Sequence, residues 1–269
     1  MLRLYIVNPK SYKALNIKMT VASLPMYDWP ELKESTDAFW QGLAKHAGLI
    51  GNLDRATHYV DLWRNPKLDF SQTCGYPFTH EFNGLLSYVA TPHYVCSGCN
   101  DGSYSSFIFA RETKQLQEFH GKIAAVNAMD SMSGMLALKL VFAPWVQNGE
   151  FFERKIITGG HLNSLKAVRE GNADVCAIDA VCAALAQKYR PQVLEGLVMI
   201  AQSPMVPSLP FVTRVRNPDH LRIALEKTFS DPELKTARED LLMHGFSNLG
   251  AGAYDRITTL EKNLPPFNL

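Results

Sequence analysis

The sequence predicts an α/β protein with two lobes, each a mostly parallel sheet flanked by helices, that close over a cleft. Three observations support this fold class. Residues 156–189 run strand, turn, helix, strand and helix, which is the pattern of a parallel α/β unit. Residues 122–141 show another strand followed by a helix. Residues 203–210 contain three prolines, which suit a stiff crossing between lobes better than a flexible linker.

The N-terminal part begins with an expected strand at 17–24, where apolar and polar residues alternate until Pro25. A loop at 26–30 carries two aromatic residues. The next helix is expected to be capped by Ser35 or Thr36 and to end at Gly48, with an inward face of Phe39, Trp40, Leu43 and Ala47.

The middle of the chain is expected to alternate strands with helices. Short apolar pieces at 61–63 and 68–71 lead to a turn at 72–77 and then to a strand. The remaining expected strands are residues 85–91, 105–111, 122–127, 156–158, 175–178 and 197–201. Short helices are expected at 116–121 and after residue 134, through Leu136, Leu140 and Val141.

The segment after residue 158 carries clear boundary signals. Gly159 and Gly160 end its strand, and a helical pattern opens at Ser164 and stops at Gly171. Asp179 follows the next strand and is expected to cap an alanine-rich helix that runs toward Tyr189.

The C-terminal part returns to the first lobe. After residues 211–214 the chain is expected to be helical, with Leu221, Leu225 and Phe229 at helical spacing. We therefore assign residues 1–91 and 205–269 to a discontinuous lobe 1 and residues 92–204 to lobe 2. Connections near Thr91-Pro92 and Ser203-Pro204 would act as a hinge.

Composition excludes several classes of function. The 269 residues carry a net charge of about +1 with 46% apolar residues, so neither nucleic acid nor an anionic membrane is an expected partner. No apolar run approaches the length that spans a bilayer. The first ten residues lack the apolar core of a secretory leader, so the expected location is cytoplasmic, or periplasmic if the native leader is missing. The sequence contains no GxGxxG, P-loop, GxSxG or HExxH motif, and no cofactor is expected.

The five cysteines leave at least one thiol unpaired within the chain. Cys176 and Cys182 fall in apolar patterns and are expected in the core. Cys96 and Cys99 form a single CxxC without the second pair that a tetrahedral zinc site needs, so no metal is expected. A loop disulfide involving Cys74 and Cys99, in an exported protein, and a dithiol redox role are the alternatives.

The strongest candidate for a binding site is the helix start at Ser131-Met132-Ser133-Gly134. Two hydroxyls and the free N–H groups of a helix N-terminus can hold a phosphate-like or carboxylate group. The alternative is that Asp130 or Ser131 only caps the helix. Asp130 would also repel a dianion, unless it pairs with a cationic part of the ligand.

Other candidates lie on loops that follow strands, where ligands bind in α/β proteins. His161 follows Gly159-Gly160 and is expected to contact the ligand or to pack within its loop. Asp179 is a second candidate contact in addition to its expected role as a helix cap. From the other lobe, Tyr27 and the segment Gln72, Cys74, Gly75 and Tyr76 would face the cleft.

Taken together, these motifs resemble the phosphonate/phosphate-type substrate-binding proteins of ABC transporters, which have the type 2 periplasmic-binding-protein fold. The resemblance rests on Ser131–Gly134, 159–168, 171–174 and 177–179, with the upstream 72–77 and the prolines of 203–210, and it covers most of 17–230. It implies that Ser131 and Ser133 hold an anionic headgroup and that His161 and Asp179 complete the site.

We therefore expect a protein that binds a small anionic or zwitterionic solute without breaking a bond, with an ABC permease as a candidate partner. The first alternative is a cytoplasmic lyase-like enzyme on the same fold, as in the menaquinone pathway, with His161 or Asp179 as general acid or base. The second is an intracellular sensor whose closure is read by a regulatory protein.

Overall fold

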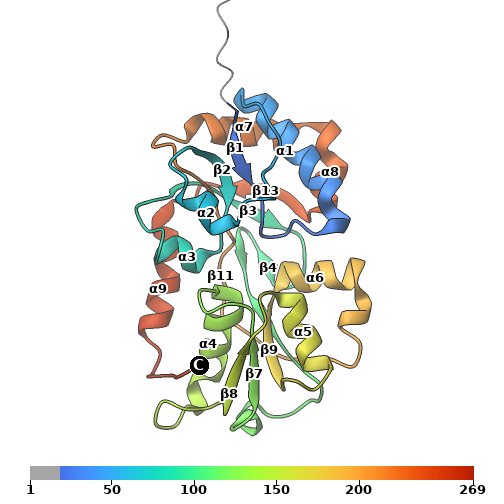
Figure 1. The fold of residues 1–269 in the computed structure, drawn as a ribbon, viewed down its shortest axis with the longest axis vertical. Helices are drawn as coiled ribbons and strands as arrows, with labels where there is room; N and C mark the ends of the chain where they lie inside the picture. The colour runs from blue at the N-terminus through green and yellow to red at the C-terminus, as the bar shows by residue number, and fades with distance from the viewer. Residues whose placement is uncertain (1–18) are drawn as a thin grey trace, which may run out of the picture.

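A computed structural model describes residues 19–269, and these form two α/β lobes stacked end to end (Figure 1). Residues 17 and 18 of the first expected strand lie outside the described residues. Each lobe has a five-stranded sheet, and a three-stranded sheet lies at the crossing between them. The predicted fold class, a two-lobed α/β protein, is confirmed.

The sheet of the first lobe combines strands from both ends of the chain, in the order β1-β2-β12-β3-β13. These strands are β1 (Val21–Ser23), β2 (Leu68–Gln72), β12 (Phe211–Thr213), β3 (Ser87–Tyr94) and β13 (Met243–Ser247). The helices of this lobe are α1 (Lys33–Ala47), α2 (Tyr59–Arg64), α3 (Gly75–Thr79), α7 (Asp219–Ser230), α8 (Lys235–Asp240) and α9 (Asp255–Lys262). Helix α1 packs on α7 and α8, and its buried Trp40 stacks on Phe70 of β2.

The sheet of the second lobe comes from one continuous stretch of chain, in the order β10-β6-β9-β7-β8. Its strands are β10 (Val198–Gln202), β6 (Ser106–Ala110), β9 (Val175–Asp179), β7 (Ile123–Val126) and β8 (Arg154–Ile157). The accompanying helices are α4 (Ala137–Phe142), α5 (His161–Arg169) and α6 (Ala180–Tyr189). Strands β7, β8 and β9 run parallel, and their C-terminal ends face the first lobe (Figure 1).

The sheets are mixed, which corrects the prediction that each is mostly parallel. Only the β1–β2, β7–β8 and β7–β9 pairs are parallel among the strand pairs of these two sheets in residues 19–269. The reason lies in the crossings. Strands β6 and β12 each enter their sheet directly from the interlobe crossing, so they run opposite to β9 and β2, whose C-terminal ends face the cleft.

The crossing segments are held together by the small sheet of β11 (Val206–Pro207), β5 (Ser103–Tyr104) and β4 (Cys99–Asn100). Strand β3 continues through Thr91-Pro92 to Tyr94, where β13 still pairs with it. The lobe boundaries at 91/92 and 204/205 stay a prediction. A third connection follows α9, because the Asn268 N–H donates to the Gly149 carbonyl in the second lobe at 2.7 Å. Figure 1 shows this C-terminal segment ending beside α4.

Several local predictions are wrong. Helix α1 begins at Lys33, so Thr36 lies inside it and its hydroxyl donates to the Leu32 carbonyl at 3.0 Å instead of capping the helix. Helix α5 begins at His161, three residues before the predicted start. The expected turn at 72–77 contains the start of α3, and the expected all-helical C-terminal part contains β13. In residues 19–269, no helix combines the length and apolar character needed to cross a membrane.

Candidate functional site

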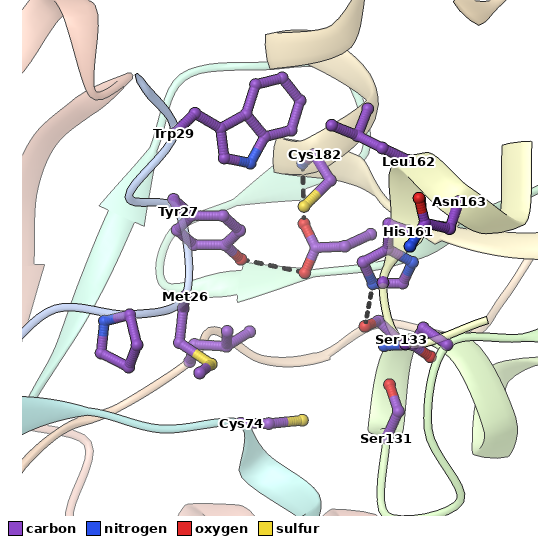
Figure 2. A pocket seen from close by; sticks show the side chains of 16 residues that line it. Met26, Tyr27, Trp29, Cys74, Ser131, Ser133, His161, Leu162, Asn163 and Cys182 are labelled. Atoms are coloured by element: carbon purple, nitrogen blue, oxygen red, sulfur yellow. Dashed lines mark hydrogen bonds between the residues drawn. The ribbon is translucent and has the colours of Figure 1, made fainter. Parts of the chain in front are cut away.

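A cavity of about 400 Å³ lies between the lobes and is bounded by loops from both (Figure 2). The first lobe and the return crossing contribute Pro25, Met26, Tyr27, Trp29, Cys74 and Leu209. The second lobe contributes Asn127, Ser131, Ser133, Gly159, Gly160, His161, Leu162, Asn163, Asp179 and Cys182. Most of the second group follow the C-terminal ends of β7, β8 and β9, so the parallel part of that sheet builds one wall of the cavity.

The serine motif begins a helix whose first turn is wide. The Ser131 carbonyl accepts hydrogen bonds from the N–H groups of both Met135 (3.1 Å) and Leu136 (3.0 Å), which makes Met132–Leu136 a π-helical turn before α4. The Ser131 hydroxyl oxygen accepts from the Gly134 N–H at 3.0 Å, so Ser131 caps the helix. Its own hydroxyl hydrogen stays available for another acceptor.

His161 is brought against this helix start. Its Nε2 lies 2.9 Å from the Ser133 hydroxyl, and either group can be the donor. Burial lowers the pKa of His161 to about 4, and a backbone contact with Ala177 opposes that effect in part. The imidazole is therefore neutral at neutral pH and fixes the position of Ser133 (Figure 2).

Asp179 both caps α6 and joins the lobes. Its Oδ1 accepts from the N–H groups of Val181 at 2.7 Å and Cys182 at 3.2 Å, which confirms the predicted cap. Its Oδ2 accepts from the Tyr27 hydroxyl of the first lobe at 2.9 Å. Burial raises the pKa of Asp179 to about 6, against the lowering by these hydrogen bonds. Burial, and then the charge of Asp179, raise the pKa of Tyr27, so its phenol stays protonated and donates.

The segment after β2 contributes one residue to the cavity, Cys74. Its sulfur accepts from the Met132 N–H of the opposite lobe at 3.5 Å. Burial raises the pKa of the Cys74 thiol to about 11, so it is a neutral group. The first free amide of the helix start therefore meets a weak acceptor from the other lobe, which a ligand oxygen could replace.

Four of the predicted site residues do not line this cavity. The Gln72 side chain is buried and donates to the Tyr94 hydroxyl at 2.8 Å and to the Leu209 carbonyl at 3.0 Å. The Tyr76 hydroxyl donates to Glu261 of α9 at 2.7 Å. Gly75 packs against α9 instead, and the Met132 side chain is buried in the core.

Asn127 was missed by the sequence analysis. It follows β7 directly, and its Oδ1 is buried without a hydrogen-bond partner among the described residues. A Cβ at Gly134 would lie 1.7 Å from this oxygen, so only glycine allows the amide to sit against the helix start. The detectable signal was its position at the end of a strand, immediately before the serine motif.

The cavity offers neutral hydrogen-bond donors and one carboxylate, since no lysine or arginine is among its lining residues. An oxyanion held here would be bound by hydroxyl, amide and backbone N–H groups. No group of three or more His, Cys, Asp or Glu side chains in residues 19–269 is arranged to hold a metal ion.

A family model described as the periplasmic substrate-binding protein of a phosphonate ABC transporter matches residues 21–250. Comparison with curated proteins gives no match.

Solved structures with the same architecture come from several bacteria. PhnD1 from Prochlorococcus marinus, in complex with methylphosphonate, has a TM-score of 0.72 and 13% identity over 91% of this chain and 97% of that one. A Xanthomonas citri protein bound to chloride ion has a TM-score of 0.70 and 17% identity over 91% and 96% of the two chains. A binding protein component of an ABC phosphonate transporter from Pseudomonas aeruginosa has a TM-score of 0.68 and 17% identity over 91% and 95%. At these identities the likeness shows the fold.

Proposed function

Because the chain belongs to the family of periplasmic substrate-binding proteins of phosphonate ABC transporters, we propose that it captures a small phosphonate or phosphate-ester-like solute between its lobes and releases it unchanged. The enzyme alternative, with His161 or Asp179 as general acid or base, gains no support from the family. The sensor alternative shares the binding step and differs only in the partner, because a regulatory protein in place of a permease would bind the closed form.

The observation that carries this proposal is the helix start that faces the cavity at Ser131 and Ser133. A helix N-terminus carries partial positive charge and unpaired N–H groups, which favours an oxyanion without a basic side chain. The free hydrogen of the Ser131 hydroxyl and the Met132 N–H are the first donors. An anion would raise the pKa of nearby His161, and a protonated ring would donate to Ser133 and free that hydroxyl hydrogen for the ligand.

Asp179 and Tyr27 favour a ligand with a second, cationic or hydrogen-bonding group. A buried carboxylate with a pKa near 6 is stabilised by an ammonium group within a few ångströms, which would lower that pKa again. The proposed ligand is therefore anionic or zwitterionic, with the oxyanion at Ser131 and Ser133 and the other end toward Asp179.

Contacts to both lobes provide the mechanism of closure. Tyr27 and Cys74 come from the first lobe and meet Asp179 and Met132 of the second. A ligand that also touches both lobes favours the closed form in proportion to its differential affinity for it. We infer that an ABC permease reads this closed form and that the protein works in the periplasm.

The test is calorimetric titration of protein stripped of ligand by unfolding and refolding. The probes are methylphosphonate, an aminoalkylphosphonate, inorganic phosphate and sulfate, with native mass spectrometry before stripping to weigh any ligand that copurifies. Ser133→Ala should weaken binding of the phosphonates, while Ser230→Ala, at an exposed serine of the first lobe, should not. Tight binding of neutral or purely cationic solutes with no response to any oxyanion would refute the proposal.

A further inference from the structure

The turn Cys96-Ser97-Gly98-Cys99 brings two thiols together outside the ligand cavity. Their sulfurs lie 3.3 Å apart, and the Cys99 N–H donates to the Cys96 carbonyl at 3.1 Å, which closes the turn. Gly98 has a φ of +83°, and a Cβ there would lie 2.7 Å from the Phe107 ring and 2.9 Å from Ala180. The turn is therefore pressed onto the second lobe in one conformation, which keeps the two sulfurs adjacent.

This turn lies within the first crossing between the lobes. On one side, the Val95 N–H donates to the Leu242 carbonyl of the first lobe at 2.8 Å. On the other, Cys99 pairs with Tyr104 in the small sheet, and Tyr104 pairs with Val206 of the return crossing. Any bond between Cys96 and Cys99 therefore constrains the segment through which the lobes move relative to each other.

We propose that Cys96 and Cys99 are a thiol–disulfide site that oxidation closes into an intramolecular disulfide and that this bond stiffens the interlobe crossing. The sulfurs need to approach from 3.3 Å to about 2.05 Å, a movement that side-chain rotation within a four-residue turn supplies. Both side chains are partly exposed, so a small oxidant reaches them.

The chemistry is exchange with a small disulfide such as oxidised glutathione. The Cys96 thiolate attacks one sulfur of glutathione disulfide, forms a mixed disulfide and expels a glutathione thiolate. The Cys99 thiolate then attacks the Cys96 sulfur and expels the second glutathione thiolate. The two cysteines lose two electrons and two protons, and the glutathione disulfide gains both. The Cys99 thiol, 3.3 Å from the Cys96 sulfur, can donate to the Cys96 thiolate once it forms, which lowers the pKa of Cys96 and favours it as the first nucleophile.

The other cysteines are poorly placed for this reaction. Cys176 and Cys182 are buried, and burial raises the pKa of both thiols. Cys74 lies in the wall that the first lobe contributes to the ligand cavity, where its sulfur accepts from the Met132 N–H. The sulfur adjacent to Cys99 is that of Cys96, so a Cys74–Cys99 disulfide is not what this structure favours.

The site is tested by thiol mapping of the folded, reduced, full-length protein after incubation with glutathione disulfide. Acid quenching, denaturation, alkylation with N-ethylmaleimide and peptide mass spectrometry report every cysteine. Cys96 and Cys99 should both escape alkylation by N-ethylmaleimide, and to the same extent, whereas Cys176 and Cys182 should be fully alkylated. In Cys99→Ser the reaction should stop at a mixed disulfide on Cys96. Full alkylation of both thiols in the wild type, or a persistent mixed disulfide there, would overturn the proposal.

The effect on the crossing is measured by hydrogen exchange of ligand-free protein. In oxidised wild type, amide exchange across 95–105 and 203–207 should slow several-fold relative to the reduced form, with no change in β7 and β9. Cys96→Ser treated in the same way should show no slowing. A disulfide that forms without altering exchange in these segments would refute the stiffening.

Discussion

Replacing Asp179 by asparagine removes one buried charge while keeping the shape of the side chain. The amide oxygen can still accept from the N–H groups of Val181 and Cys182, because asparagine caps helices about as well as aspartate. The amide NH₂ can donate to the Tyr27 oxygen where the carboxylate accepted from it. The Asp179→Asn variant therefore isolates the free energy of keeping a carboxyl group in this site.

The magnitude follows from the pKa of Asp179, which burial raises from 3.8 to about 6. The native state binds the proton more tightly than the unfolded state, so protonation favours folding. This contribution is complete below about pH 3.8 and is lost as the pH rises through about 6. At about 1.36 kcal/mol per pKa unit, the loss amounts to roughly 3 kcal/mol. Wild type should therefore lose roughly 2–2.5 kcal/mol relative to Asp179→Asn between pH 4 and pH 7, because part of the full loss of about 3 kcal/mol has already occurred at pH 4.

The assay is urea unfolding of ligand-free wild type and Asp179→Asn at half-unit pH steps across this range. Asp255→Asn, at an exposed carboxyl group of α9, controls for the loss of one negative charge. If the stability difference between the two proteins stayed constant with pH, or if wild type gained stability relative to Asp179→Asn as the pH rose, the native site would not disfavour the carboxylate.

Three further changes probe the helix start. Ser133→Ala should weaken binding of a phosphonate probe about tenfold by calorimetry, since one hydrogen bond contributes about 1–1.5 kcal/mol. The same change should lower stability in urea by about 1 kcal/mol, because His161 Nε2 loses its hydrogen-bond partner. Gly134→Ala should destabilise the protein by about 1–3 kcal/mol, because its Cβ meets the Asn127 oxygen at 1.7 Å, whereas Gly160→Ala, with nothing within 4 Å, should be near neutral. Burial lowers the pKa of His161 to about 4, so its contribution to stability is present above pH 6.5 and falls as the pH drops toward 4. His161→Ala should remove this fall in stability. The variant should still unfold cooperatively and should bind the phosphonate probe more weakly.

Short-range signals were sufficient for much of the second lobe. The strand at 175–178, the cap at Asp179 and the following helix are encoded in neighbouring residues, and the structure places them as β9, the Asp179 cap and α6. Local patterns also located the strands that became β6, β7 and β8. These elements form wherever alternation, a cap and a glycine break agree along one stretch of chain.

Pairing between distant segments could not be predicted from local patterns. Strand β13 contains His244 and Gly245 and alternates poorly, and it exists because β3 offers an edge to pair with. The directions of β6 and β12 depend on where the chain crosses between lobes, which the sequence reveals only through prolines. We predicted mostly parallel sheets because local patterns do not show that β6 and β12 enter their sheets from the cleft side.

The site shows the same limit at the level of single side chains. The segment 72–77 does reach the cleft, but the turn of α3 at Gly75 directs Tyr76 toward Glu261 of α9 and leaves Cys74 at the cavity. Aromatic residues looked like the better ligand contacts, and nothing in the spacing distinguished them from the thiol. The orientation is decided by α9, which lies far away in sequence.

Outside the cavity, the Glu31–Arg190 and Lys188–Asp240 ion pairs join the two lobes. At the cavity itself, two polar contacts between described residues join them, and each has a chemical weakness that a ligand can exploit. The Tyr27–Asp179 hydrogen bond keeps a carboxylate away from water, which costs free energy above pH 6. The Met132 N–H donates to a thiol, a poor acceptor. A zwitterion would correct both at once, with its cation beside Asp179 and its oxyanion on the Met132 amide. A ligand with only one of these charges would correct one defect, so a molecule that carries both groups should bind more tightly than one that carries either group alone.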